Sequence, residues 1–236
     1  MHPPPIQIEI AVDSSTDALA AATEGADRLE VCARLDVGGL TPSLDLLCQI
    51  RKDLPLLPLV AMVRAPGGDH RVSDATLDGL LQTMVDGRCG LVQGFIFGFI
   101  EDSRIDLKAC HALRQAAADV PCIFHRAFDD LEDQFDGIES LIALGFRRVL
   151  TSGGIGPPSE RLERLHRIAH HAAHRIEILP GGGIRAQNAA AFASIPGVRW
   201  VHSSCRSADA PERFSAAEFT RLRASLDSLG NDRAIP

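Results

Sequence analysis

The chain has 236 residues, of which 45% are hydrophobic, so it can form an ample core as one large domain or two small ones. Its formal net charge of -7, with acidic and basic residues interspersed, argues against general nucleic-acid binding, which usually requires a basic face. The start lacks a basic region followed by an apolar stretch, and no run approaches ~18 apolar residues, so we expect a cytoplasmic protein that does not enter a membrane.

Apolar, strand-like runs alternate with amphipathic helical segments along the sequence. The predicted strands span residues 6–12, 28–34, 57–64, 91–99, 121–128, 147–152, 176–181 and 199–204. The predicted helices span residues 15–25, 43–53, 74–87, 106–118, 132–144, 158–173, 186–194 and 215–229. Each helix is long enough to connect one parallel strand to the next.

Eight successive strand–helix units in roughly this length are typical of a TIM barrel, the (β/α)8 form of the α/β class, which takes about 250 residues. We therefore predict a single TIM-barrel domain over residues 1–236, with residues 1–5 and 230–236 as flexible tails. The alternative, a doubly wound open sheet, normally has a glycine-rich phosphate-binding turn after its first strand. Residues 12–15 contain no glycine, so the barrel is favoured, and no nucleotide cofactor is predicted.

Polar residues recur with a period of two in the first two predicted strands, although parallel strands are normally apolar on both faces. Glu9 alternates with isoleucines in the first strand, and Glu30 and Cys32 alternate with apolar residues in the second. Because the apolar face should meet the helices, Glu9 and Glu30 should point into the barrel. Interior carboxylates need cations, hydrogen bonds or a metal, so structural pairing with interior arginines and a functional role both remain open.

The third and fifth predicted strands also end in polar residues. Alternation places Met62 and Arg64 on one face of the third strand. In the fifth, the segment FHRAFD at residues 124–129 concentrates His125, Arg126 and Asp129 where the strand should end. Alternation puts His125 on the interior face and Arg126 on the opposite one. Because barrel active sites lie at the carboxyl ends of strands, this segment is a candidate catalytic site; a hydrogen-bonded core histidine is the alternative.

The ends of the strands and the loops after them supply the candidate ligand-binding residues. These are Arg64 and Asp69 at the third strand, Thr151 and Ser152 at the sixth, Gly181, Gly182 and Gly183 at the seventh, and His202, Ser203 and Ser204 at the eighth. Glycines let backbone amides approach a ligand closely, and barrels often bind phosphate after strands seven and eight. The loops therefore predict an anion site, with tight turns that need glycine as the alternative.

Several motifs occur together and in order along the chain. They are GGLTPS at 38–43, Arg64 followed by GGD at 67–69, FHRAFD at 124–129, RVLTSG at 148–153, PGGGI at 180–184 and VHSS at 201–204. From about Glu9 to Ser207 the chain resembles the CutC copper homeostasis family. The resemblance implies a cytoplasmic TIM barrel associated with copper tolerance and copper binding, and it implies no particular enzymatic reaction. Pro66 stands where the family has an arginine and Trp200 where it has an acidic residue, which changes the charge of the implied pocket.

The copper ligands that the resemblance implies are incomplete in this chain. Family members usually have a cysteine where this chain has Ala11, so Cys32 is the one that remains of two cysteines implied to bind copper. Cu(I) favours soft thiolate and thioether ligands. Cys32 would therefore need Met62 or His202 to complete a site.

Two functional hypotheses follow. The first is a copper-binding homeostasis protein with Cys32 and Met62 as metal ligands. The second is an enzyme that acts on a small phosphorylated or carboxylated metabolite, with histidine as general acid or base and arginines holding the anion. Its candidate catalytic residues are His125, Arg126, Asp129, Glu9 and Glu30.

The remaining composition narrows the chemistry and the partners. The only lysines, Lys52 and Lys108, fall in predicted helices, which argues against a Schiff base at a strand end. The six cysteines are scattered without paired spacing, so we expect reduced thiols. The expected partner is a small molecule or a metal ion, and a homo-oligomer or a role through protein contacts remains open.

Overall fold

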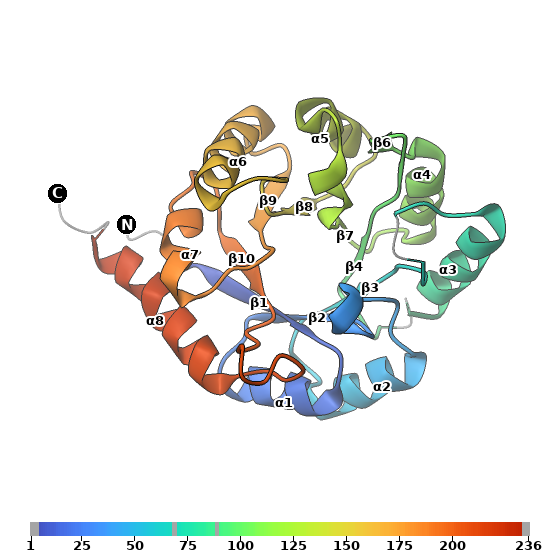
Figure 1. Cartoon of the computed structure of the whole chain (residues 1–236). Helices are drawn as coiled ribbons and strands as arrows, with labels where there is room; N and C mark the ends of the chain where they lie inside the picture. Colours follow the sequence, from blue (N-terminus) through green and yellow to red (C-terminus); the bar gives the residue numbers. More distant parts are fainter. Residues whose placement is uncertain (1–4, 68–69, 88–89, 233–236) are drawn as a thin grey trace.

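The computed structural model describes residues 5–67, 70–87 and 90–232. Eight parallel strands form one sheet in the order β10-β1-β2-β3-β4-β7-β8-β9. β9 and β10, at the two ends of this order, lie side by side, so the sheet curves into a barrel with helices around it (Figure 1). The predicted TIM-barrel fold is therefore confirmed.

The element bounds follow the predicted order closely. The barrel strands are β1 (Gln7–Val12), β2 (Arg28–Val31), β3 (Leu59–Met62), β4 (Gly94–Phe97), β7 (Cys122–Phe124), β8 (Arg148–Thr151), β9 (Glu177–Pro180) and β10 (Trp200–Ser203). The helices are α1 (Ser15–Thr23), α2 (Leu44–Asp53), α3 (Asp74–Gly87), α4 (Leu107–Ala116), α5 (Gln134–Ala143), α6 (Pro158–Ala172), α7 (Ala186–Ala193) and α8 (Ala216–Asp232). α8 continues past the predicted helix end at residue 229.

Two features differ from the prediction. Most strands are shorter than predicted, and β2 and β7 lose mainly residues at their carboxyl ends, where the chain continues into loops. A small antiparallel hairpin, β5 (Ile100–Glu101) and β6 (Arg104–Ile105), follows β4 and was not predicted. Its turn residues Asp102 and Ser103 both have positive φ, of 48° and 56°. Two-residue hairpin turns of this kind usually contain Asn-Gly or Asp-Gly, so the Asp-Ser sequence did not indicate a hairpin.

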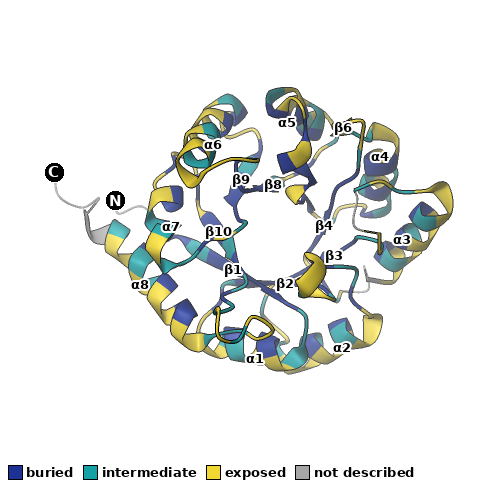
Figure 2. Ribbon diagram, viewed as in Figure 1, coloured by how far each residue is buried: buried dark blue, intermediate teal, exposed yellow. Residues whose placement is uncertain are grey.

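Apolar side chains form two separate layers. The larger layer lies between the strands and the helices, and the strands and the inner sides of the helices are buried (Figure 2). The smaller one fills the inside of the barrel and consists of Cys32, Val60, Met62, Ile96, Ile123, Leu150, Leu179 and Trp200. The alternation of side chains along each strand separates the two layers, because successive residues point to opposite faces.

Side-chain caps fix the start of several helices. Ser14 accepts a hydrogen bond from the backbone N–H of Asp17 at the start of α1, and Ser43 accepts one from Leu46 at the start of α2. Each cap satisfies a backbone donor that has no partner inside its helix. The caps fix where these helices begin after the loops at the carboxyl ends of β1 and β2.

Candidate active site

A cavity of about 760 Å³ opens at the carboxyl ends of the strands, inside the ring of loops. The predicted site residues that line it are Glu30, Met62, Arg64, His125, Arg126, Asp129, Gly182, Gly183, His202, Ser203 and Ser204. Arg185, Arg206 and His70 also line it and were not predicted. The sequence indicates them only by their position in loops that follow strands, and it does not define the course of these loops. We call this cavity the mouth cavity.

Glu9 lies beneath the mouth cavity in the middle of the barrel and is fully buried. Its Oε2 is 2.5 Å from Nε of Arg28, and its Oε1 is 2.8 Å from Nδ1 of His202. Burial raises the pKa of Glu9, but Arg28 and His202 lower it by more, and the result is a pKa of about 2. Glu9 is therefore ionised. The sequence allowed pairing with an interior arginine without identifying it, and the structure shows that this arginine is Arg28.

Glu30 has the opposite environment. It is 3% exposed, and its Oε2 has no hydrogen-bond partner among the described residues. The nearest cation is His202, whose Nδ1 lies 3.8 Å away, beyond hydrogen-bonding distance. Burial is the main cause that raises the pKa of Glu30, the charge of His202 opposes it and that of Glu9 adds to it, which gives a pKa of about 7. Glu30 can therefore both hold and release a proton near neutral pH.

His202 connects the two carboxylates. Burial lowers its pKa, but the charge of Glu30 and the hydrogen bond and charge of Glu9 raise it further, so the net direction is upward. The imidazole is therefore stabilised as a cation between Glu9 and Glu30. One atom from each of these three residues lies within 4.8 Å of the others, which is a spacing that a metal ion could bridge. Such an ion would have to replace the proton of His202 and share Glu9 with Arg28.

His125 is placed by a change of backbone conformation that the sequence did not indicate. The predicted strand 121–128 ends at Phe124, and residues Arg126–Asp130 form a short 3-10 helix, η2, with His125 as its N-cap. His125 Nδ1 accepts a hydrogen bond from the N–H of Ala127 at 3.2 Å. Its buried Nε2 has no partner among the described residues, and burial, with the charges of His70 and Arg64, lowers its pKa well below the usual value. His125 is thus a neutral imidazole at the cavity wall.

The same helix turns Arg126 into the mouth cavity, whereas strand alternation predicted that it would face away. Its Nε lies 3.0 Å from Oδ2 of Asp129, and its side chain is 53% exposed. Gly182 on the next loop has no side chain and a φ of 76°; a Cβ there would lie 3.0 Å from the guanidinium carbon of Arg126. The glycine therefore leaves room for the arginine at the rim.

Asp129 is a positioning residue in this arrangement. Its carboxylate accepts hydrogen bonds from the hydroxyls of Thr151 and Ser152, at 2.6 and 2.7 Å, and from the backbone N–H of Ser152 and Gly154. Thr151 and Ser152 are buried and face this carboxylate, so they lie behind the mouth cavity and not in its lining. Asp129 fixes the loop after β8 against η2.

Asp129→Asn should destabilise the protein by about 3 kcal/mol, because one acceptor oxygen becomes an NH2 group that faces several buried donors. The measurement is urea unfolding followed by circular dichroism. Asp130→Asn is the matched control, since the neighbouring Asp130 side chain is 50% exposed, and its change should stay within about 0.5 kcal/mol. A similar loss in both variants would contradict the role given to Asp129.

The remaining predicted residues fall into three groups. Gly182 and Gly183 line the cavity with positive φ, whereas Gly181 faces inward, where a Cβ would lie 3.3 Å from His202. The hydroxyl of Ser203 donates a hydrogen bond to the carbonyl of Ile184, in the loop after β9, so this donor is already used within the protein. Asp69 lies outside the described residues.

Arg64 and Arg206 bring guanidinium groups to the wall of the cavity. Arg64 Nη1 lies 3.3–3.4 Å from the carbonyl oxygens of Val37, Gly38 and Gly39, while its buried Nε has no partner among the described residues. Arg206 Nη2 lies 2.6 Å from Oδ1 of Asp13. Both side chains are therefore held in place before any ligand binds.

Cys32 and Met62 lie at the upper end of the barrel interior. A Cβ on Gly39 would be 3.4 Å from Sγ of Cys32 and 3.4 Å from Cε of Met62, so both side chains contact the loop after β2 from below. Cys32 is fully buried and its thiol donates to the carbonyl of Val12 at 3.5 Å. Burial, with the charges of Glu30 and Asp13, raises the pKa of this thiol far above its usual value, which disfavours the thiolate that Cu(I) needs.

The fold and the position of the site define a TIM-barrel protein with its candidate site at the end of the barrel where such proteins carry out chemistry. The sequence profile of the CutC family matches residues 6–207. The chain therefore belongs to the CutC family, as its motifs indicated.

Relatives and solved structures agree with this assignment. The chain is 37% identical over 201 residues to a human protein named copper homeostasis protein cutC homolog, covering 85% of this chain and 73% of the human one. It is 35% identical over 239 residues to a family protein CutC from Rhizobium meliloti, covering 94% and 97% of the two chains. The solved structure of the CutC protein from Streptococcus agalactiae superimposes with a TM-score of 0.80 at 29% identity, over 84% of this chain and 98% of that one.

More distant solved structures support the fold alone. A type I 3-dehydroquinate dehydratase from Clostridium difficile superimposes with a TM-score of 0.67 at 14% identity, over 99% of this chain and 95% of that one. Among the described residues, none of the helices has the length and apolar character needed to cross a bilayer.

Proposed function

We propose that the mouth cavity binds a small carboxylate or phosphate, and that Glu30 and His202 transfer protons to or from it. The observation that carries this proposal is the buried, unpartnered Oε2 of Glu30 at the cavity floor, on a carboxyl group whose pKa is about 7. A buried polar atom without a partner costs stability, and such sites often reflect function. An arriving substrate would supply the missing partner.

The surrounding residues suit an anionic substrate. Arg64, Arg126 and Arg206 line the cavity, and guanidinium groups bind carboxylates and phosphates in bidentate fashion. Glu9 and Arg28 lie below and act as positioning residues, because they hold the imidazole of His202 in one orientation. With no lysine among the described lining residues, the chemistry narrows to acid–base isomerisation, elimination or hydrolysis.

A thermal-shift screen of small phosphates and carboxylates tests the proposal. A compound that binds the mouth cavity should stabilise the protein, and Arg126→Ala should weaken it about tenfold, the effect of losing one hydrogen bond to a charged group. Arg167→Ala, at an exposed arginine outside the mouth lining, is the matched control and should leave the shift unchanged. Glu30→Gln should retain binding and abolish turnover of the bound compound. If the compounds bound Arg126→Ala with the same affinity as the original protein, they would not bind in the mouth cavity as proposed.

Copper binding is a second candidate function, favoured by one observation: Cys32 and Met62, a thiol and a thioether, contact the same glycine at the top of the barrel interior. They supply at most two soft donors, which is a coordination number that Cu(I) accepts. When bound there, copper would be held by these two sulfur atoms, and Cys32 would have to lose its proton first.

Titration of Cu(I) against a strong chelator tests this candidate. We expect affinity to rise with pH, because the raised pKa of the Cys32 thiol makes the proton compete with the metal. Cys32→Ser should remove the binding, whereas Cys110→Ser, at another fully buried cysteine, should not. Equal affinity of the two variants would exclude Cys32 as a ligand.

The proposal includes a cytoplasmic location. It is supported by the five cysteines that the structure describes, which are all free thiols, as is usual for chains that fold in a reducing compartment. Cell fractionation with an antibody against the protein would test the location, and recovery outside the cytoplasmic fraction would contradict it.

A further inference from the structure

A second cavity of about 950 Å³ lies at the opposite end of the barrel, at the amino ends of the strands. We call it the amino-end cavity. Five of the eight barrel strands begin with a polar or aromatic residue that lines it: Gln7 on β1, Arg28 on β2, Arg148 on β8, Glu177 on β9 and Trp200 on β10. This end of a barrel normally contributes to stability, so a polar cavity here requires an explanation.

The first residue of each of these strands points inward because it shares the interior parity of the residues above it. These strands are neighbours in the sheet, so their polar side chains gather on one side of the barrel. The other strands present Val60, Gly94 and Ile123 to the same space. The cavity therefore has a charged half and an apolar half.

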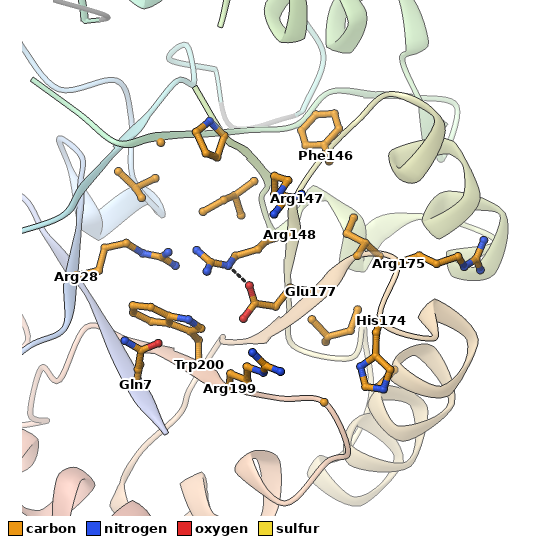
Figure 3. Close-up of a pocket in the computed structure, with 18 of the residues that line it drawn as sticks. Gln7, Arg28, Phe146, Arg147, Arg148, His174, Arg175, Glu177, Arg199 and Trp200 are labelled. Carbon is orange, nitrogen blue, oxygen red and sulfur yellow. Dashed lines mark hydrogen bonds and ion pairs between the residues drawn. The ribbon is translucent and has the colours of Figure 1, made fainter. Parts of the chain in front are cut away.

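Two guanidinium groups stack against one indole ring in the charged half. Arg28 lies 4.2 Å and Arg148 lies 5.1 Å from the centre of the Trp200 ring. Figure 3 shows the two guanidinium groups above the indole, with Arg148 hydrogen-bonded to Glu177. The ring attracts each cation through its π face, but the two cations repel each other across the space between them.

Arg28 is incompletely satisfied. It is 6% exposed and its Nε is bonded to Glu9, but its buried Nη2 has no hydrogen-bond partner among the described residues. A guanidinium in a buried site normally has all its donors paired, and a donor without a partner costs free energy. Nη2 is a free donor in the wall of the cavity.

The rim of the cavity adds further positive charge. Arg147 and Arg199 are exposed side chains at the rim, and neither has an ion pair or hydrogen-bonded side-chain partner in the part of the chain that the structure describes. The carboxylates in the lining are already engaged, since Glu177 pairs with Arg148 and Asp27 lies 2.6 Å from Arg223. Arg175 pairs with Glu139 and points away from the centre of the cavity (Figure 3). Glu177 also interacts electrostatically with Arg28, Arg147 and Arg199, so this one carboxylate faces more cations than it can neutralise.

We infer that the amino-end cavity is a second ligand site, distinct from the mouth cavity, which binds a small organic anion through Arg28, Arg147 and Arg199. The charged group, a carboxylate or a phosphate, receives hydrogen bonds from Nη2 of Arg28 and from the two rim arginines. The remainder of the ligand contacts the apolar half, at Val60 and Ile123. The site does not require the acid–base chemistry proposed at the mouth.

Trp200 allows a direct test, because it is the only tryptophan and the chain contains no tyrosine. We would titrate the full chain with inorganic phosphate, pyrophosphate and citrate in separate experiments and follow the intrinsic fluorescence of Trp200. A saturable change with at least one of them is expected, and the anion that gives it distinguishes phosphate from carboxylate ligands. Arg199→Ala and Arg147→Ala should each weaken this binding about tenfold, the effect of losing one hydrogen bond to a charged group.

Three further variants serve as controls. Arg126→Ala, at the other end of the barrel, should leave the titration unchanged, and Arg199→Gln repeats the loss of charge with less change in side-chain size. Trp200→Phe should abolish the fluorescence change while calorimetry still detects binding. Absence of a saturable change with all three anions, or a change that Arg126→Ala removes and Arg199→Ala does not, would overturn the inference.

Discussion

Arg28→Met is expected to destabilise the barrel by about 3–5 kcal/mol, since it removes the cation beside Glu9 and leaves a buried carboxylate with His202 as its one charged partner. Glu9 is fully buried and its pKa is held at about 2, against a burial effect that alone would raise it, chiefly by Arg28 and His202. Methionine keeps much of the aliphatic volume of arginine, so the loss reflects charge more than packing. Denaturant unfolding at pH 7 gives the difference.

A double variant and a surface variant control this experiment. Arg28→Met with Glu9→Gln removes both charges and should recover part of the loss, because no uncompensated charge remains. Arg34→Met breaks a pair with Asp36 in which the side chains are 62% and 60% exposed, and it should cost no more than about 1 kcal/mol. If Arg28→Met lowered the free energy of unfolding no more than Arg34→Met does, the buried pair would contribute no more to stability than an exposed one.

Glu30→Gln is expected to stabilise the protein at pH 8, although it removes a candidate catalytic group. The pKa of Glu30 rises from 4.5 to about 7 on folding, so the folded state binds this proton more tightly than the unfolded state. Its contribution is fully present below pH 4.5 and is lost as the pH rises through 7, a loss on the order of 3 kcal/mol. Glutamine carries no such proton, so the variant should match the original protein near pH 4.5 and exceed it in stability at pH 8.

Urea unfolding across this pH range measures the effect. The raised pKa of His202 also makes stability fall with rising pH, but that loss begins above its ordinary value of 6.5, so the interval from pH 4.5 to 6.5 reports mainly on Glu30. Glu132→Gln, at an exposed carboxylate for comparison, should give a curve parallel to that of the original protein. Parallel curves for Glu30→Gln as well would show that Glu30 does not hold a proton at neutral pH.

The parts of the site that depend on strand geometry could be predicted from the sequence. Alternation along a strand is fixed by the backbone, so the polar residues of the first two strands were correctly placed inside the barrel, with Glu9 and Glu30 buried there. The family motifs and the eight repeated units likewise indicate the barrel from the sequence alone. Glu9 proved to be paired with an interior arginine, whereas Oε2 of Glu30 has no hydrogen-bond partner among the described residues. Alternation cannot distinguish these outcomes.

The parts that depend on loop conformation could not be predicted. η2 begins at Arg126, two residues after Phe124, and this single change in backbone conformation reverses the side on which Arg126 lies. The hydrogen bonds that join Asp129 to Ser152 connect residues far apart in the chain, and their types alone did not indicate them. Arg206 reaches the mouth from a loop with no regular periodicity, so no pattern in the sequence distinguishes it from the other arginines.

The interior ion pairs have a consequence for the barrel as a whole. Arg28, Glu9, His202 and Glu30 form a continuous series from the amino-end cavity to the mouth cavity, through a region that most barrels fill with apolar side chains. An anion next to Arg28 would reduce the electrostatic attraction between this guanidinium and Glu9. The proton affinities of His202 and Glu30 would then change as well. By thermodynamic reciprocity, a change of protonation at the mouth would alter anion affinity at the other end by the same factor. The barrel axis would then act as an electrostatic connection between two openings that share no lining residue.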